Sequence, residues 1–502
     1  MEMKMNGHLL NETDSIVVET EVRKDLVDKS FLEIMEDGAK QLVKFHGVMD
    51  IDEVKKSLSN SARKGGLGNL LEECYFGYQA NGIQAADLEA SGIEVKATPY
   101  EKRKNGNRVA GERLVITMIS YNEPVEKDFY ASHLWDKIKQ ILLIHYFRQK
   151  EIENHLLYKI RFVTLFTPPE KDMAIIIEDY NLIISKIESG NAHELSEADT
   201  NYLGACTKGA TAEKSLVPQF YNPAVKAKRR AFCYKTSYMT YVLNEYVLNA
   251  KPVSEPILKD KIQLAGQTFD GYIQSLINNN RGMTDKELCE KYDLKYTNNK
   301  AQWNTLAFRM LGIKSNRAEE FEKANIKVKT IRIEENGNIR EHMSLPPISL
   351  NDIAKEEWEE SSLYDYFSES KFLFVVFKKK EETYELLGAK LWHMPYEELS
   401  ETVKAGWEKT KIVIKEGIVF ERREQKNGPV IENNLPGSSE NRIIHVRPHA
   451  SKRYYKMEDG EIIGDGTPSM AEKLPDGRWM PKQSFWLNNS YIKSIVENID
   501  KG

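Results

Sequence analysis

GIEVKATP, residues 92–99, is the stretch that decides the fold, because it predicts a β-strand with two charged residues on one face. The strand is expected over 93–98, with Pro99 ending it. Alternate side chains of a strand point to opposite faces, so Glu94 and Lys96 share a face and Val95 faces the other. An Asn-Gly turn at 102–107 and a second strand at 113–121 complete a predicted hairpin.

Two further acidic residues precede this strand. Asp87 lies in the turn before it, and Glu73 lies on a helix-like segment, 69–76, that Gly77 closes. These carboxylates and Lys96 are expected to converge at one end of the hairpin.

Such a set suits hydrolysis of a phosphodiester. Carboxylates hold magnesium, which activates water and offsets charge on the phosphate. Asp87, Glu94 and the carbonyl of Val95 are the predicted metal ligands. Lys96 is expected to position the attacking water, and Glu73 to bind a second metal or its water shell. The sequence therefore predicts a magnesium-dependent nuclease.

The order of expected elements indicates a mixed α/β fold in two copies. A helix at 134–149, a strand at 158–166 and a helix at 179–189 follow the hairpin. The first half then recurs in order: 86–89, 93–98, 105–107 and 232–239 resemble 319–322, 326–331, 336–338 and 485–492. Chance similarity is the alternative to tandem duplication. The expected organisation is a catalytic domain over 1–250, a linker over 251–295 and a second domain over 296–502.

The second copy is predicted to be catalytically inactive. Lys327 replaces Glu94, and Glu320 replaces Asp87. If Gly77 corresponds to Gly312, Phe308 replaces Glu73. An amine and a phenyl ring cannot ligate magnesium. This copy could still bind DNA or clamp the first half.

Composition limits the other classes of function. The chain has 502 residues, 41% hydrophobic, with a net charge of −5, which fits an ordinary globular protein and neither suggests nor excludes nucleic acid. No apolar run approaches the roughly 20 residues of a membrane helix, and no signal core begins the chain, so a cytoplasmic location is expected. Four scattered cysteines speak against a zinc site or a disulfide framework.

Several motifs together resemble a known family. KGGLG at 64–68, YFG at 75–77 and the strand at 92–99 resemble MutH, a mismatch-repair nicking enzyme, and more closely the Sau-type restriction endonucleases that cut at GATC. Similarity to the latter extends along the chain, at 192–197, 206–210, 226–232, 445–449 and 482–486. Ala86 stands where the family's PD-(D/E)xK motif has proline.

The resemblance implies two tandem PD-(D/E)xK domains, magnesium dependence and cleavage of double-stranded DNA at GATC, leaving 5′-phosphates. The N-terminal copy would cut, and the C-terminal copy would bind DNA as an effector. A cognate DNA methyltransferase would be the genetic partner. The protein would not associate with membranes, and it would act as a monomer or a DNA-induced dimer.

The same resemblance suggests which residues contact DNA. Thr207, Lys208 and Gly209 fall in a loop that reads base edges, where an amine can bond guanine. Further DNA-binding candidates are Lys64, Arg229, Arg230, Tyr238, Arg447 and His449. The two arginines are expected at phosphates. Tyr238 could wedge against bases or belong to the core.

Two other functions remain open at this point. A MutH-type repair nickase would need only one such domain, whereas this chain carries two. A DNA-binding regulator with a relic centre would have no reason to keep clustered carboxylates, which are costly.

Overall fold

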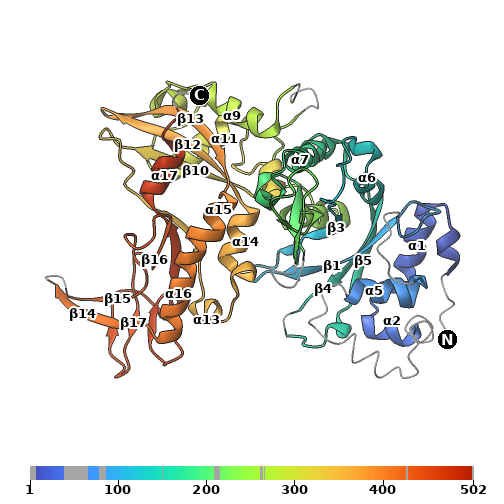
Figure 1. Cartoon of the computed structure of the whole chain (residues 1–502). Coiled ribbons are helices and arrows are strands. Elements are labelled where there is room, and N and C mark those ends of the chain that lie inside the picture. The colour runs from blue at the N-terminus through green and yellow to red at the C-terminus, as the bar shows by residue number, and fades with distance from the viewer. Residues whose placement is uncertain are drawn as a thin grey trace. The chain divides into compact units, whose positions relative to one another are not determined.

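The computed structural model describes residues 7–38, 66–78, 86–149, 151–208, 215–259, 264, 266–425 and 428–499. The chain divides into two compact units, each with mixed sheets and flanking helices (Figure 1). Unit 1 is Met1–Gln263 with Glu319–Asn325, and unit 2 is Leu264–Ala318 with Ile326–Gly502. The segment 251–295 is therefore not simply a linker, because helices α9 (Phe269–Asn278) and α10 (Asp285–Lys291) are part of unit 2.

The main sheet of unit 1 has the order β2-β1-β4-β5. Its strands are β1 (Glu94–Lys102), β2 (Arg108–Ala110), β4 (Ile141–Phe147) and β5 (Ile160–Phe166). β1 runs parallel to β4, and β4 runs antiparallel to β5. The prediction of a helix over 134–149 is wrong in its second part, because α6 spans only His133–Ile138 and β4 follows it. A short apolar run is ambiguous between a buried strand and a helix.

The predicted hairpin also differs from the structure. β1 continues through Pro99, and its hairpin partner is β2 rather than the segment 113–121. Proline is tolerated because β2 pairs with β1 only from Tyr100 onward, while the Pro99 carbonyl accepts a hydrogen bond from Gly111 at 2.8 Å. β3 (Leu114–Met118) instead joins a second sheet of order β3-β9-β6, with β9 at Arg230–Tyr234 and β6 at Leu203–Thr207.

The remaining elements of unit 1 cover these sheets or link their strands. They are α1 (Ser15–Leu26), α2 (Phe31–Asp37), α5 (Gly66–Leu71), α7 (Glu170–Glu188), β7 (Leu216–Val217), β8 (Ala227–Lys228), α8 (Thr236–Val242) and α12 (Glu319–Ala324). One hydrophobic cluster joins α1, α2 and α5 to β1, β4 and β5, so the helix before β1 is fixed by core packing.

Unit 2 repeats this topology. β10 (Ile326–Ile333) runs parallel to β12 (Lys371–Lys380), which runs antiparallel to β13 (Thr383–Trp392). A second sheet has the order β11-β21-β16, with β11 at Met343–Pro347, β16 at Ile444–Pro448 and β21 at Gln483–Leu487.

Individual hydrogen bonds and turns are also equivalent in the two units. Lys208 N donates to Arg229 O at 2.8 Å in unit 1, and His449 N donates to Lys482 O at 2.9 Å in unit 2. Gly77 and Gly312 have φ of 79° and 78°. This shared topology confirms the predicted tandem arrangement of two mixed α/β domains.

The other elements of unit 2 are α11 (Lys300–Met310), α13 (Leu350–Ile353), α14 (Ser362–Glu369), α15 (Tyr396–Glu398), α16 (Lys404–Glu416), β14 (Phe420–Gln425), β15 (Gly428–Asn433), β17 (Tyr455–Lys456), β18 (Ile462–Ile463), β19 (Ala471–Lys473), β20 (Trp479–Pro481) and α17 (Asn489–Val496).

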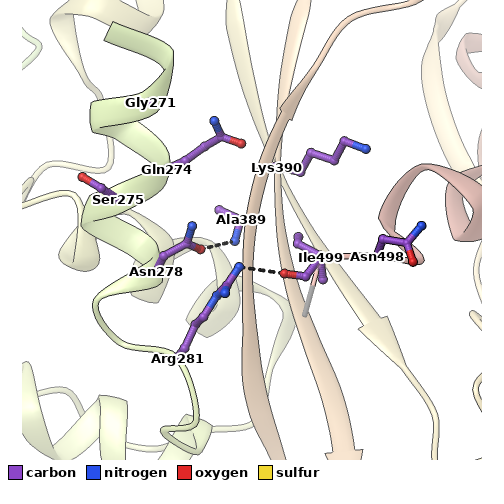
Figure 2. A pocket seen from close by; sticks show the side chains of 9 residues that line it. All are labelled: Gly271, Gln274, Ser275, Asn278, Arg281, Ala389, Lys390, Asn498 and Ile499. Atoms are coloured by element: carbon purple, nitrogen blue, oxygen red, sulfur yellow. Dashed lines mark hydrogen bonds between the residues drawn. The ribbon is translucent and has the colours of Figure 1, made fainter. Parts of the chain in front are cut away.

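A pocket of about 440 Å³ lies beside α9 and β13 (Figure 2). Side chains of α9 bond the backbone of this edge strand: Asn278 accepts from Ala389 N at 2.9 Å, and Gln274 from Leu391 N at 3.1 Å. The α9 side chains therefore satisfy amides of an otherwise open sheet edge.

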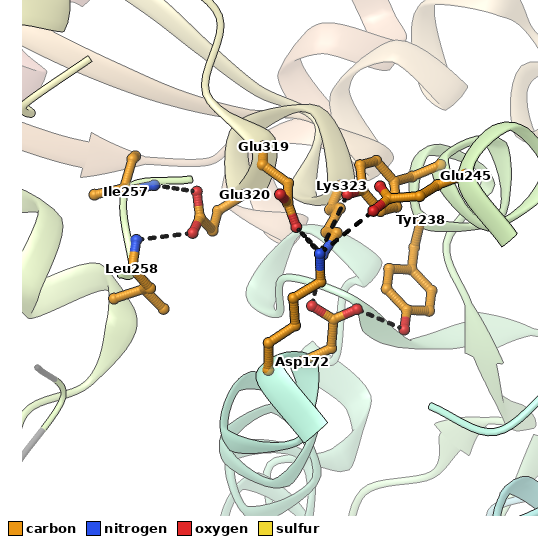
Figure 3. A network of polar contacts seen from close by, with 10 residues as sticks. Asp172, Tyr238, Glu245, Ile257, Leu258, Glu319, Glu320 and Lys323 are labelled. Carbon is orange, nitrogen blue, oxygen red and sulfur yellow. Dashed lines mark hydrogen bonds and ion pairs between the residues drawn. The ribbon is translucent and has the colours of Figure 1, made fainter. Parts of the chain in front are cut away.

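Helix α12 comes from the second repeat of the sequence but packs in unit 1 (Figure 3). Lys323, 1% exposed, bonds Asp172 and Glu319, each at 2.6 Å. Glu320, which occupies the sequence position of Asp87, accepts hydrogen bonds from the amides of Ile257 and Leu258 at 2.9 Å. In the second repeat, the acidic residue at the position of Asp87 thus stabilises the backbone of unit 1.

Two expectations from composition can be compared with the structure. Cys74, Cys206, Cys233 and Cys289 are buried and none forms a disulfide. Among the helices of the described residues, none combines the length and apolar character needed to cross a membrane.

Candidate active site

The helix before the site ends in an unusual turn. α5 continues into a π-helical turn, Glu72–Phe76, and stops at Gly77 in the left-handed region. Tyr78 N donates to Glu72 O at 3.1 Å, whereas in unit 2 the corresponding Ile313 N donates to Phe308 O at 2.9 Å. When Gly77 and Gly312 are aligned, the carbonyl that accepts this hydrogen bond in unit 1 belongs to a residue one position earlier than the accepting residue in unit 2. Such π-bulges occur often at functional sites.

A tight turn places Asp87 beside the start of β1. Leu88 and Ile93 pair across this turn, and Gly92 supplies a φ of 69°. Asp87 Oδ2 accepts a hydrogen bond from Val95 N at 2.9 Å. The carboxylate of Asp87 is thereby held next to the strand that carries Glu94.

Glu94 is the centre of the cluster. It is 1% exposed, and its carboxylate accepts from Lys96 Nζ at 2.5 Å and from Lys137 Nζ at 2.8 Å. Lys137 comes from α6 and also lies 3.9 Å from Asp87 Oδ1. The structure therefore brings Asp87, Glu94 and Lys96 together as predicted. It adds Lys137, which sequence spacing did not reveal.

Charge at the cluster is strongly perturbed. Burial, followed by repulsion from Glu94, raises the pKa of Asp87. Burial and then Asp87 raise the pKa of Glu72 to about 7. Burial alone would lower the pKa of Lys96, but the carboxylates of Glu94 and Asp87 outweigh it, so the pKa is raised. Raised carboxyl pKa values indicate an excess of acidic groups that a bound cation would relieve.

Glu72, adjacent to the predicted Glu73, is the helix carboxylate coupled to this cluster. The charges of Asp87, Lys96 and Glu94 all act on Glu72. Glu73 is buried, and its charge acts on Glu72 and raises the pKa of the Cys74 thiol, after burial. The 69–76 helix therefore supplies two adjacent carboxylates, of which only Glu73 was predicted.

Tyr78 also faces the carboxylates. Burial raises the pKa of its hydroxyl, and Asp87, Glu72 and Glu94 raise it further. The hydroxyl has no hydrogen-bond partner within the part of the chain that the structure describes. A phenol held at an acidic cluster can donate to an oxygen bound there.

The donors fit a hard divalent cation in type but not in their present arrangement. Carboxylates of Glu72, Asp87 and Glu94 are the oxygen donors that magnesium prefers. Within the described ranges, no three acidic, His or Cys side chains are already arranged as metal ligands. Lys96 and Lys137 contact both oxygens of Glu94, so these ammonium groups neutralise the carboxylate in this structure.

The predicted DNA contacts divide into surface and core. Thr207 and Lys208 are half-buried at the end of β6, and Arg229 is exposed. Arg230 is 3% exposed and donates to Ala205 O at 2.7 Å, so it does not present itself to phosphate.

Tyr238 is a core residue rather than a wedge. Its side chain is 0% exposed, its hydroxyl donates to Asp172 at 3.1 Å, and its ring stacks on Tyr202. Val242, one turn later on the same helix, is buried as well. Of the other candidates in this unit, Lys64 and Gly209 lie outside the described residues.

In unit 2, Arg447 and His449 lie at the exposed end of β16. The Arg447 guanidinium stacks on Trp486 at 4.7 Å, and His449 Nδ1 lies 2.8 Å from Ser484 Oγ.

Comparison with known proteins agrees with this geometry. The family described as DNA mismatch repair enzyme MutH matches at residues 76–179 and again at 311–405, once in each repeat. The type II restriction enzyme Sau3AI of Staphylococcus aureus is 33% identical over 463 residues, which cover 87% of this chain and 93% of that enzyme. With two MutH-like regions and similarity along nearly its whole length, the chain belongs to the Sau3AI family of type II restriction endonucleases.

Proposed function

We propose that this endonuclease cuts both strands of DNA at GATC in a magnesium-dependent reaction, with a single centre in unit 1. The supporting observation is that Asp87, Glu94 and Lys96 meet at one end of β1 in only the first of two MutH-like repeats. The GATC site follows from the resemblance to the Sau-type family, which the 33% identity to Sau3AI supports.

Asp87, Glu94 and the carbonyl of Val95 would hold the metal, with Glu73 near a second ion or its water shell. When bound, magnesium would polarise the phosphate and acidify a coordinated water. Lys137 neutralises one Glu94 oxygen now, so this ammonium and a metal ion compete for the same donor.

Lys96 acts as an ammonium group. Its raised pKa keeps it protonated at neutral pH, so it orients water and offsets charge on the phosphate rather than removing a proton. Glu72, with a pKa of about 7, is half-ionised at neutral pH and is therefore suited to accept the proton of the attacking water.

Substrate contacts come from both units. In unit 1, Thr207 and Lys208 would read bases, and Arg229 would contact phosphate. Unit 2 would bind DNA without cutting, through a surface that includes Arg447 and His449. One centre per chain cuts two strands either by transient dimerisation on DNA or by sequential nicking. A cytoplasmic location and a cognate methyltransferase gene belong to the same proposal.

The test uses purified protein and an unmethylated plasmid that contains GATC, with and without magnesium. Discrete linear fragments only in the presence of magnesium support the proposal. Nicked circles alone would indicate a MutH-type nickase, and a mobility shift without cutting would indicate a regulator. Lys96→Ala is the matched control, because it should bind the plasmid without cutting it.

A further inference from the structure

The second unit keeps the backbone of the catalytic centre but reverses its charge. Glu94 pairs with Ile141 across parallel strands β1 and β4, and Lys327 pairs with Phe372 across parallel strands β10 and β12. Two positions further along each strand stand Lys96 and Lys329. The Glu–Lys pair of unit 1 is thus a Lys–Lys pair in unit 2.

The helix beside this strand also differs between the two units, in the residue that contacts the strand position of Glu94 or Lys327. α6 follows the capping residue Ser132, and α14 follows the capping residue Ser361. Five residues after each cap stand Lys137 and Tyr366. Lys137 donates to Glu94, whereas the ring of Tyr366 lies 4.2 Å from Lys327 Nζ. The ammonium that neutralises a carboxylate in unit 1 is replaced by an aromatic face that accepts an ammonium.

Further groups surround the lysine pair. Lys327 Nζ donates to Ser370 Oγ at 2.5 Å, and Glu369 is the acidic group whose charge acts on Lys327. Lys300, at the start of α11, acts on Lys329. Positive charge therefore exceeds negative charge in this cluster.

Holding the lysines of this cluster in their charged form is unfavourable when no anion is bound. Burial and then Lys329 lower the pKa of Lys327 to about 8, and burial and then Lys300 lower the pKa of Lys329. Both side chains remain partly accessible to solvent. Like charges brought together in a partly buried site are stabilised when an anion binds between them.

We propose that Lys327 and Lys329 bind a phosphate of the DNA backbone, in the place where unit 1 would hold the phosphate that it cuts. Ammonium groups are compact donors for phosphate oxygens. The site rests on the proposed DNA binding of unit 2, and it makes the altered catalytic residues themselves the source of that binding.

The experiment measures binding of a GATC duplex by the full chain carrying Lys96→Ala, over a range of salt concentrations. Lys327→Gln with Lys329→Gln is added to this parent. Lys378→Gln with Lys379→Gln, on the same strand β12 that flanks β10, is the matched control.

The lysine-pair variant should bind about tenfold more weakly, with a salt slope lower by about 1 to 2, and the control should change binding less than about twofold. If the lysine-pair variant binds DNA as the control does, the proposal of a phosphate site is wrong while the proposed function stands. If the parent itself does not bind DNA, both are wrong. Thermal unfolding checks folding, and Lys329→Gln alone replaces the pair if the double variant unfolds.

Discussion

The same strand position holds Glu94 in unit 1 and Lys327 in unit 2, on backbones with equivalent pairing. In unit 1 the buried carboxylate is neutralised by two ammonium groups, and in unit 2 the ammonium meets a hydroxyl and an aromatic ring. The difference shows that the fold tolerates either sign of charge at this position if the neighbouring helix supplies a matching partner.

The helix before the strand shows the same relation. Glu72 corresponds to Ala307 and Glu73 to Phe308 when Gly77 and Gly312 are aligned. The π-helical turn occurs where the acidic residues are, and regular α11 occurs where they are absent. The proposed catalytic site of unit 1 therefore coincides with a local departure from the regular helix that unit 2 does not make.

The largest expected effect is on the chemistry. Glu94→Ala or Lys96→Ala should reduce the single-turnover cleavage rate by about a thousandfold, because each removes a group at the reacting phosphate. DNA binding should remain measurable by gel shift. Lys378→Ala in unit 2 should cut normally; normal cutting by either unit 1 variant would remove the assignment of the centre.

The next effect is on stability. Lys323→Met removes the ammonium partner of buried Asp172, while Glu319 keeps Lys171, so the free energy of unfolding should fall by about 3 kcal/mol in urea titration. The comparison in unit 2 is Lys371→Met, whose partner Asp270 is 33% exposed and can be solvated. Equal losses in the two variants would contradict this reasoning.

Lys137→Met should have a smaller effect, because Glu94 keeps its bond from Lys96. We expect a loss of roughly 2 kcal/mol in the free energy of unfolding, partly restored by added magnesium. Tyr366→Leu is the matched variant in unit 2, where magnesium should restore nothing. The same recovery in both variants would argue against a metal site confined to unit 1.

Glu72→Gln tests the acidic excess through pH. The folded pKa of about 7 lies above the unfolded value, so the folded state binds more protons between these values and loses stability as pH rises through them. Allowing for partial solvation, the variant should exceed the parent by about 1 to 2 kcal/mol at pH 8 and match it at pH 4. Exposed Glu89→Gln is the control. A gain at pH 4 as large as at pH 8 would refute the assignment.

The smallest effect concerns phosphate contacts at equivalent positions. Arg229→Gln in unit 1 and Lys482→Gln in unit 2 should each weaken binding a few-fold at low salt and reduce the salt slope by about 1. Both residues are exposed and lie beside equivalent backbone bonds. Loss in only one variant would show that the two units do not use the same surface.

The parts that the sequence predicted are local. Asp87, Glu94 and Lys96 come from a turn and the strand after it, so strand alternation suffices to bring them together. The duplication was predictable because similar segments keep their order. Lys137 could not be found in this way, since it lies on a later helix and reaches Glu94 only through the packing of α6.

The errors have tertiary causes. The apolar run at 141–147 is a buried strand, because it pairs with β1 along one edge and with β5 along the other in the interior of the sheet. For Tyr238 the sequence left a wedge and a core role open, and packing against Tyr202 and Asp172 decides that it is buried. Neither pattern nor propensity contains that information.

The placement of α12 has a consequence for how this protein can be divided. The chain leaves unit 1 after Gln263, returns for Glu319–Asn325 and leaves again, so no single cut separates the units. A fragment ending at Gln263 would lack Lys323 and would leave Asp172 without its ammonium partner. Because this helix of the second sequence repeat belongs to unit 1, any single chain break between the repeats removes residues from one unit, and fragments have to follow the discontinuous boundaries of the units.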